Sequence, residues 1–459
     1  MSIIRLNPWA IALCLLGASV FSTTSHAVPS FARQTGLECT ACHISWPELT
    51  TVGRQFKLGG YTLMKPVTQG ERPWVSFDRD TNPPIIPLAG FFQASASSTG
   101  STNSAGTSSD DFPRQNELMV QQLSLFLAGR VNDHAGGFIQ WSYDGLEKHS
   151  AMDNVDLRLT NRYQADNTDV LYGLSLNNSP TMSDIYNTTP VWGFPFASSS
   201  VAPTPAASAV IQEGLAQQVA GLNAYALWNR TVYAEVGAYR TADGMFSAFR
   251  AGQDLSTAAQ LKDTAPYWRL ALQHEWDEGT QSVMVGAFGL DVSKYPDPTD
   301  LSTPVDQFRD RGIDAQYQYV GDTHRMTTQL SYIQEDQNLN GSFAAGGASN
   351  IRNTLDVMSL KFTYYFQTKY GVSLGYQRIR GSNDDLLYNT GSALSGSASA
   401  SPDSAAYILE FNWLPLRDKR ITLQYTAYDR FNGGTSNYDG FGRNASDNNT
   451  LYLLGWFMF

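Results

Sequence analysis

The sequence predicts a mainly β protein, a 16-stranded antiparallel outer-membrane β-barrel preceded by a small helical domain. Three observations support this fold class. Segments of about ten residues alternate between apolar and polar side chains, as at 313–319 and 358–364, which is the period of a strand with one apolar face. Short turns alternate with long polar loops. The last segment ends in Phe459, which resembles the signal read by the outer-membrane assembly machinery.

The composition narrows the class further. The chain has 459 residues, of which 42% are hydrophobic, 12% aromatic and 16% charged. After residue 27 no apolar run approaches the roughly 18 residues of a membrane-spanning helix, which excludes a polytopic helical membrane protein. The 31 Lys and Arg against 42 Asp and Glu leave a net charge of −11 without a basic tract. A nucleic-acid partner is therefore also excluded.

Residues 1–27 have the pattern of an export signal peptide. Arg5 is followed by the apolar stretch 11–20 and by the small-residue cleavage site Ser25-His26-Ala27. The alternative is a short N-terminal membrane anchor, although the apolar stretch is too short to span a bilayer. We expect an exported protein in which Cys39 and Cys42 are the only cysteines left after cleavage.

Sixteen segments carry the strand pattern, and they make up a barrel domain predicted over residues 81–459. They lie near 87–98, 115–130, 135–145, 154–163, 167–177, 220–228, 231–241, 265–276, 280–292, 308–320, 324–335, 354–367, 370–380, 404–414, 418–429 and 449–459. An even strand count places both barrel ends on the short-turn, periplasmic side. The long loops, such as 178–219 and 381–403, are expected to cover the outer mouth.

Cys39-Thr40-Ala41-Cys42-His43 has the C-x-x-C-H spacing of a c-type haem attachment site. Two thiols three positions apart lie on one helical face, where both can form thioethers, and the adjacent imidazole can bind the iron. A periplasmic disulfide, a redox C-x-x-C and half of a zinc site are the alternatives. No βαβ pattern surrounds the motif and no second cysteine pair completes a zinc site. Cys39, Cys42 and His43 are therefore the predicted haem-binding residues.

The motif belongs to a small helical domain predicted over residues 28–80. So short a domain buries little core by itself, and a sixteen-stranded barrel encloses a wide lumen, so we expect the domain to plug that lumen. Arg54 and Lys57 are candidate partners for haem propionates, or ordinary surface charges. Met64 is the candidate distal iron ligand. An apolar role for Met64, an open site, or a ligand from the barrel among His134, His149, His274 and His324 are the alternatives.

The residues around the motif resemble the fused monohaem cytochrome c–porin family, the outer-membrane iron(II) oxidases of iron-oxidising bacteria. The resemblance rests on 31–37 (FARQTGL) before C-x-x-C-H, on 47–62, and on two barrel stretches, 173–195 and 437–452. It implies one covalent haem c on Cys39, Cys42 and His43. It also implies one-electron oxidation of extracellular Fe(II), with electrons passed to a periplasmic c-type cytochrome by an enzyme embedded in outer-membrane lipid. It does not settle the distal ligand or any iron-binding loop residue.

Two other functions stay open from the sequence. One is a more general extracellular electron conduit with another donor or acceptor. The other is a solute porin in which the haem-containing segment is only a plug. Acidic loop pairs, Asp110-Asp111 and Asp384-Asp385, could attract a hard cation, but charged loops are mostly just solvated. No catalytic residue is predicted beyond the haem ligands.

Overall fold

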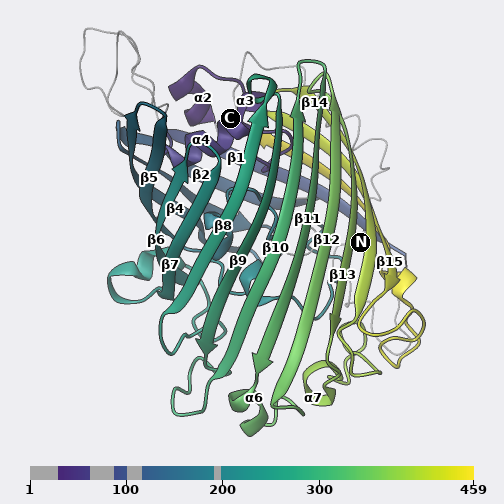
Figure 1. The fold of residues 1–459 in the computed structure, drawn as a ribbon. Helices are drawn as coiled ribbons and strands as arrows, with labels where there is room; N and C mark the ends of the chain where they lie inside the picture. Colours follow the sequence, from purple (N-terminus) through teal and green to yellow (C-terminus); the bar gives the residue numbers. More distant parts are fainter. Residues whose placement is uncertain (1–28, 63–86, 101–115, 191–197) are drawn as a thin grey trace.

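The computed structural model describes residues 29–62, 87–100, 116–190 and 198–459. Within them sixteen strands form one closed barrel, in which each strand pairs antiparallel with its neighbours in sequence and β1 pairs with β16 (Figure 1). The strands are β1 (Leu88–Thr99), β2 (Met119–Asn132), β3 (Ala135–Asp144), β4 (His149–Ala165), β5 (Thr168–Asn177), β6 (Val219–Trp228), β7 (Val232–Thr241), β8 (Ala265–Trp276), β9 (Gln281–Lys294), β10 (Asp306–Val320), β11 (His324–Asn338), β12 (Arg352–Phe366), β13 (Tyr370–Gly381), β14 (Ser404–Leu416), β15 (Lys419–Arg430) and β16 (Thr450–Met458). The predicted sixteen-stranded antiparallel barrel is confirmed.

The strands alternate between the lumen and the outside, as β8 illustrates. Its residues Tyr267, Arg269 and Ala271 are buried. Leu270 and Leu272, which alternate with them, are 49% and 59% exposed. Exposed leucines in long rows are stable only against hydrocarbon, and a closed barrel leaves no unpaired backbone edge within the bilayer. The protein is an outer-membrane protein, as predicted.

The two ends of the barrel differ. β10 and β11 are joined by 321–323 and β12 and β13 by 367–369, whereas the opposite end carries long connections such as 382–403. Figure 1 shows the N-terminal helices α2 (Pro29–Thr35), α3 (Cys39–Cys42) and α4 (Thr51–Leu58) at the short-turn end, and α6 (Asn340–Ala344) and α7 (Asp385–Tyr388) at the long-loop end. None of the helices in the described ranges is long and apolar enough to cross a membrane. Because the short turns of such barrels lie on the periplasmic side, the N-terminal segment lies at the periplasmic end.

Strand limits agree with the prediction to within a few residues, and the largest difference is at β4. This strand begins at His149 rather than 154, because its polar first residues pair with the end of β3 up to Asp144↔His149. Polar residues beyond the apolar band do not carry the alternation on which the prediction relied. The β3–β4 hairpin therefore extends further toward the outside than the apolar residues of its strands do.

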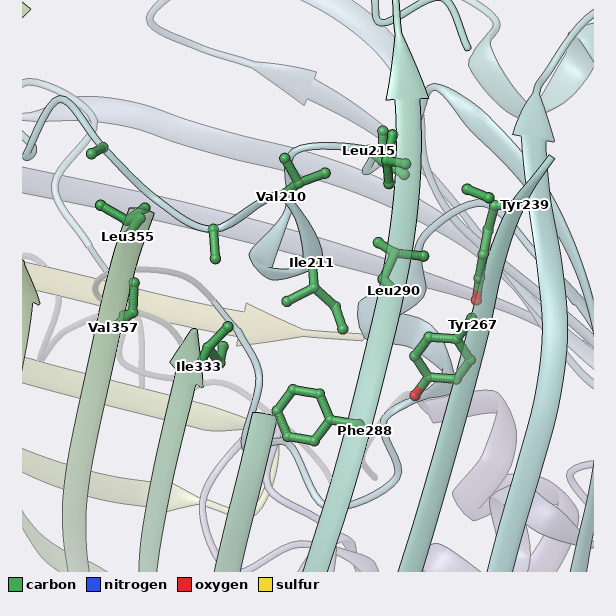
Figure 2. Packing of buried hydrophobic residues seen from close by; sticks show 14 of the residues in the cluster. Val210, Ile211, Leu215, Tyr239, Tyr267, Phe288, Leu290, Ile333, Leu355 and Val357 are labelled. Carbon is green, nitrogen blue, oxygen red and sulfur yellow. The ribbon is translucent and has the colours of Figure 1, made fainter. Parts of the chain in front are cut away.

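One long connection does not cover the outer mouth as expected. Between β5 and β6 the chain folds into the lumen, through the short helix α5 (Pro180–Ser183) and the 3₁₀ turn η1 (Val210–Gln212). Figure 2 shows Val210, Ile211 and Leu215 packed against wall residues. The wall residues labelled there are Tyr239, Tyr267, Phe288, Leu290, Ile333, Leu355 and Val357. This inward loop (residues 178–190 and 198–218) gives the barrel an apolar core inside its lumen.

A charge on the outer face of the barrel is expected to destabilise it. Ile313 lies midway along β10 and is 61% exposed, so Ile313→Arg should cost about 2–4 kcal/mol of folding free energy in lipid. Leu301→Arg, in the loop before the same strand, is the matched control and should change the free energy by less than about 0.5 kcal/mol. Denaturant titration of the barrel folded into vesicles measures both. Equal effects of the two variants would show that Ile313 does not face lipid.

Candidate haem attachment site

The predicted attachment motif forms a single helical turn. α3 spans Cys39–Cys42, and the backbone N–H of His43 donates to the carbonyl of Cys39 at 2.9 Å. Both cysteines therefore lie on one face of one turn, as the spacing requires. Cys42 carries a thiol that is not bonded to Cys39, and burial raises the pKa of that thiol to about 11. The geometry fits two thioethers to one macrocycle.

His43 is held directly after this turn in extended conformation. It pairs as a β-bridge with Leu49, and the N–H of Ile44 donates to the carbonyl of Glu48 at 3.1 Å, which closes residues 43–49 into a compact loop. The Nδ1 atom of His43 is buried without a hydrogen-bond partner among the described residues. Burial lowers the pKa of His43 to about 4, and the Pro47 carbonyl opposes this only in part. The ring is therefore neutral at ordinary pH, which is the form that ligates a metal.

Helix α4 is fixed to the attachment turn by its own N-cap. Thr50 accepts the N–H of Gly53 at 3.2 Å, and its hydroxyl donates to the carbonyl of Ala41 at 2.6 Å. Its backbone N–H donates to the carbonyl of Cys42 at 2.9 Å. A Cβ on Gly53 would lie 2.2 Å from the Cys42 carbonyl oxygen. Only glycine allows the helix to pack this closely on the turn.

Helix α4 ends before Gly59-Gly60 and buries one of its faces. Phe56 and Leu58 are buried, but Val52 is 46% exposed. Phe56 packs edge-on against Phe31 of α2 at a centroid distance of 5.1 Å, and Tyr61 stacks on the same ring at 5.1 Å. These aromatic residues form the small core of the segment.

The N-terminal segment 29–62 bonds to wall strands almost all the way round the barrel. The contacts join Arg33 to Leu88 of β1, Gln34 to Arg130 of β2, Tyr61 to Asp156 of β4, Leu58 to Tyr225 of β6, Arg54 to Gln316 and Gln318 of β10, Thr40 to Arg325 of β11, Glu48 to Lys361 and Ser45 to Tyr365 of β12, and Trp46 to Arg420 of β15. Glu38 adds an ion pair with Arg417 at 2.6 Å, in the turn between β14 and β15. The predicted plug is confirmed, and it occupies the periplasmic mouth.

The side chains that the sequence offered as propionate partners are used otherwise. Arg54 is 3% exposed and donates to Leu49 at 3.1 Å, to Gln316 at 3.0 Å and to Gln318 at 2.8 Å. Lys57 donates to the carbonyl of Met182 at 2.6 Å and lies 3.8 Å from Asp156. Both cations anchor the segment to the wall and to the inward loop.

Met64 and the signal-peptide residues 1–27 lie outside the described residues. The four wall histidines are described and all are exposed. His274 stacks on Trp276, beside the outward leucines of β8, and His324 contacts Tyr364 and Phe366 of the neighbouring strand. His134 lies in the turn after β2, and His149 opens β4 at the outer end. His274 and His324 stand at exposed positions that alternate with buried ones, so they face away from the lumen. The distal ligand itself stays a prediction.

The inward-facing residues of β10 show how the contents of the lumen are layered. From the periplasmic end, Gln318 and Gln316 bond to the N-terminal segment. Asp314 comes next and bonds to Thr188 of the inward loop, and Asp310 then accepts the backbone N–H of Ile211 at 2.7 Å. The inward loop therefore lies between the N-terminal segment and the outside.

A buried charge network that sequence patterns did not single out fixes this loop. Arg269 of β8 pairs with Asp314 and, at 3.4 Å, with Asp184 of the loop. The ring of Tyr186 lies between the guanidinium groups of Arg54 and Arg269, at 5.2 and 5.1 Å. The sequence does hold a signal for this network: Arg269 and Asp314 are charged residues at inward positions of strands that alternate between the two faces of the barrel.

The motif and the wall contacts together decide which groups can hold a cofactor. Among the residues that the structure describes, no three His, Cys, Asp or Glu side chains are grouped to hold a metal ion. Asp384, one of the loop acids considered for a cation, caps backbone N–H groups of Ser349, Asn350 and Leu387. Two thiols on one turn and a buried neutral imidazole fit a covalently attached haem.

Known proteins resemble this chain in its barrel. No protein-family model and no curated protein matches the sequence. Solved structures that share the fold are the outer-membrane channel DcaP of Acinetobacter baumannii (15% identity, 81% of this chain and 96% of that chain, TM-score 0.45), OmpF of Salmonella typhi in complex with daunomycin (12%, 81% and 97%, 0.45), and an anion-selective porin from Comamonas acidovorans (12%, 81% and 98%, 0.42).

Adding a methyl group at Gly53 should loosen the plug. Because its Cβ would collide with the Cys42 carbonyl, Gly53→Ala should cost about 1–3 kcal/mol in the docking of α4. Limited trypsin cleavage at the buried Arg54 of the folded barrel measures the opened population, which should rise about 5- to 150-fold. Val52→Ala, on the exposed side of the same helix, is the control. Cleavage of the Gly53 variant at the rate of the Val52 variant would contradict the packing described.

Proposed function

We propose that this protein is an outer-membrane electron-transfer enzyme that oxidises extracellular Fe(II) through one covalent haem c and passes the electrons to a periplasmic c-type cytochrome. The observation that carries the proposal is the C-x-x-C-H turn docked in the periplasmic mouth of a porin-like barrel. The resemblance of residues 31–62 to cytochrome–porin fusions that oxidise iron(II) supports the choice of donor.

The chain's own residues would divide the work. Cys39 and Cys42 would attach the macrocycle, and His43 would be the proximal ligand. When bound, the haem would supply a one-electron couple, so that one Fe(II) becomes Fe(III) for each electron delivered to the periplasmic cytochrome. Met64 is proposed as the distal ligand, and its thioether would raise the potential.

The position of the segment favours electron transfer across the membrane. Residues 29–62 are bonded around the mouth on the short-turn side, where Glu38 is 47% exposed on its side chain and reachable from the periplasm. The donor side is reached through the outer half of the lumen, past the inward loop. A soluble periplasmic partner can reach a redox group held at this place, and the barrel wall separates that redox group from lipid.

A solute channel is the second candidate, and the barrel itself favours it, because sixteen strands enclose a lumen wide enough for water and ions. In that function the N-terminal segment would be a plug without a redox role. A general conduit with another donor shares every structural feature of the iron oxidase and differs only in the reductant that it accepts.

The cofactor itself is the first test. The mature protein should carry one haem that survives denaturation and acidic solvent extraction, because thioethers are covalent. Cys39→Ala combined with Cys42→Ala should abolish this haem, whereas His43→Ala should keep it attached and lose its low-spin spectrum. Haem that is freely extractable, or a mature protein without haem, would contradict the proposal.

Transport separates the candidate functions. Full-length protein in sealed vesicles should transfer electrons from outside Fe(II) to an enclosed cytochrome c, and it should conduct ions far less than an open sixteen-stranded porin. The Cys39→Ala, Cys42→Ala variant is the control for electron transfer. Free ion conduction without electron transfer would establish the solute channel. Haem reduction by other donors but not by Fe(II) would establish the general conduit.

A further inference from the structure

Arg420 of β15 is buried against the loop that follows His43. The residue is 1% exposed, and its Nη1 atom donates to the carbonyl of Trp46 at 3.1 Å. The face of its guanidinium lies 4.4 Å from the ring of Trp456 and 5.9 Å from that of Trp46. The barrel wall thus places a cation at the closed loop 43–49 that carries the predicted proximal ligand.

The remaining donors of this guanidinium are buried and unused. Nε and Nη2 of Arg420 have no hydrogen-bond partner within the described ranges. These two N–H groups lie on the same edge of the planar group, which is the fork that takes both oxygens of one carboxylate. Stacking on tryptophan engages the face of the guanidinium, and the neutral Tyr365 hydroxyl nearby interacts with it, but no carboxylate pairs with that edge. Buried donors without acceptors are costly, so the edge points to a missing acceptor.

No nearby protein carboxylate supplies an acceptor for Nε and Nη2 of Arg420. Glu410 on the neighbouring strand β14 accepts hydrogen bonds from Asn412 at 2.5 Å and from Gln424 at 3.2 Å, and Glu48 pairs with Lys361. Elsewhere in the lumen the comparable buried arginines do have carboxylate partners: Arg158 pairs with Asp156, and Arg269 with Asp184 and Asp314. Arg54, which belongs to the N-terminal segment itself, is hydrogen-bonded to neutral oxygens.

We propose that Arg420 is a cofactor-binding residue contributed by the barrel wall, whose Nε–Nη2 edge receives a propionate carboxylate of the haem attached to Cys39 and Cys42. The inference rests on the proposed function, since it requires that haem. It assigns the propionate contact to the wall instead of to Arg54 and Lys57. It also gives the barrel a direct part in setting the redox potential, because an uncompensated carboxylate beside the iron would oppose uptake of an electron.

The test is the haem potential as a function of pH in full-length, haem-loaded protein. In Arg420→Gln the potential should fall at high pH, where the propionate is ionised without a partner. It should rise toward the wild-type value as the propionate is protonated at low pH. The pH dependence of the potential should therefore steepen. Arg54→Gln is the matched control, because Arg54 is a buried arginine of the N-terminal segment itself, and it should leave the pH profile of the potential unchanged.

Arg420→Lys covers the case in which Arg420→Gln fails to fold. It keeps the charge and loses the fork, so redox-induced infrared difference spectra with ¹³C-labelled propionates should show an altered carboxylate band. A wild-type potential, pH profile and carboxylate band in the folded Arg420 variants would overturn the inference while leaving the proposed function standing. A protein without covalent haem would overturn both.

Discussion

The width of a sixteen-stranded barrel is the constraint on which the rest of the structure depends. Strands with one face toward lipid must turn their other face inward, and a barrel of this size cannot be filled by its own side chains. The chain fills it with two further segments, residues 29–62 from the periplasmic end and the inward loop, residues 178–190 and 198–218, from the outer end. Each is too short to bury a core by itself, and each uses the wall as its other half.

Because the inner wall is polar, these two segments are held by hydrogen bonds and ion pairs that must be matched. Tyr61 donates to Asp156 at 2.7 Å, and Arg54 to two glutamines. Arg269 links Asp184 of the inward loop to Asp314 of the wall. Breaking one partner of a buried pair leaves a charge that the low-dielectric interior does not tolerate. The unmatched edge of Arg420 is informative because the buried Arg158 and Arg269 each pair with a carboxylate and Arg420 does not.

Much of this could be predicted from residue patterns. Alternation with period two locates all sixteen strands, since each strand separates lipid from lumen across the apolar band. C-x-x-C-H locates the attachment turn, since the motif is local in sequence. The inward course of the loop could not be predicted, because its docking depends on Glu335, Asp310 and Arg269 far along the chain. Nor could the role of Arg420, which depends on a contact with Trp46 across the lumen.

The central claim, that a haem is held in the periplasmic mouth, is tested most directly by pulsed electron spin resonance between the ferric haem and a single nitroxide label. Labels at Lys369→Cys in the turn between β12 and β13, or at Met245→Cys in the outer loop after β7, report on the two ends. The account predicts a short, narrowly distributed distance to position 369 and a longer one to 245. A shorter distance to 245, broad distributions at both positions, or the lack of a haem signal would contradict it.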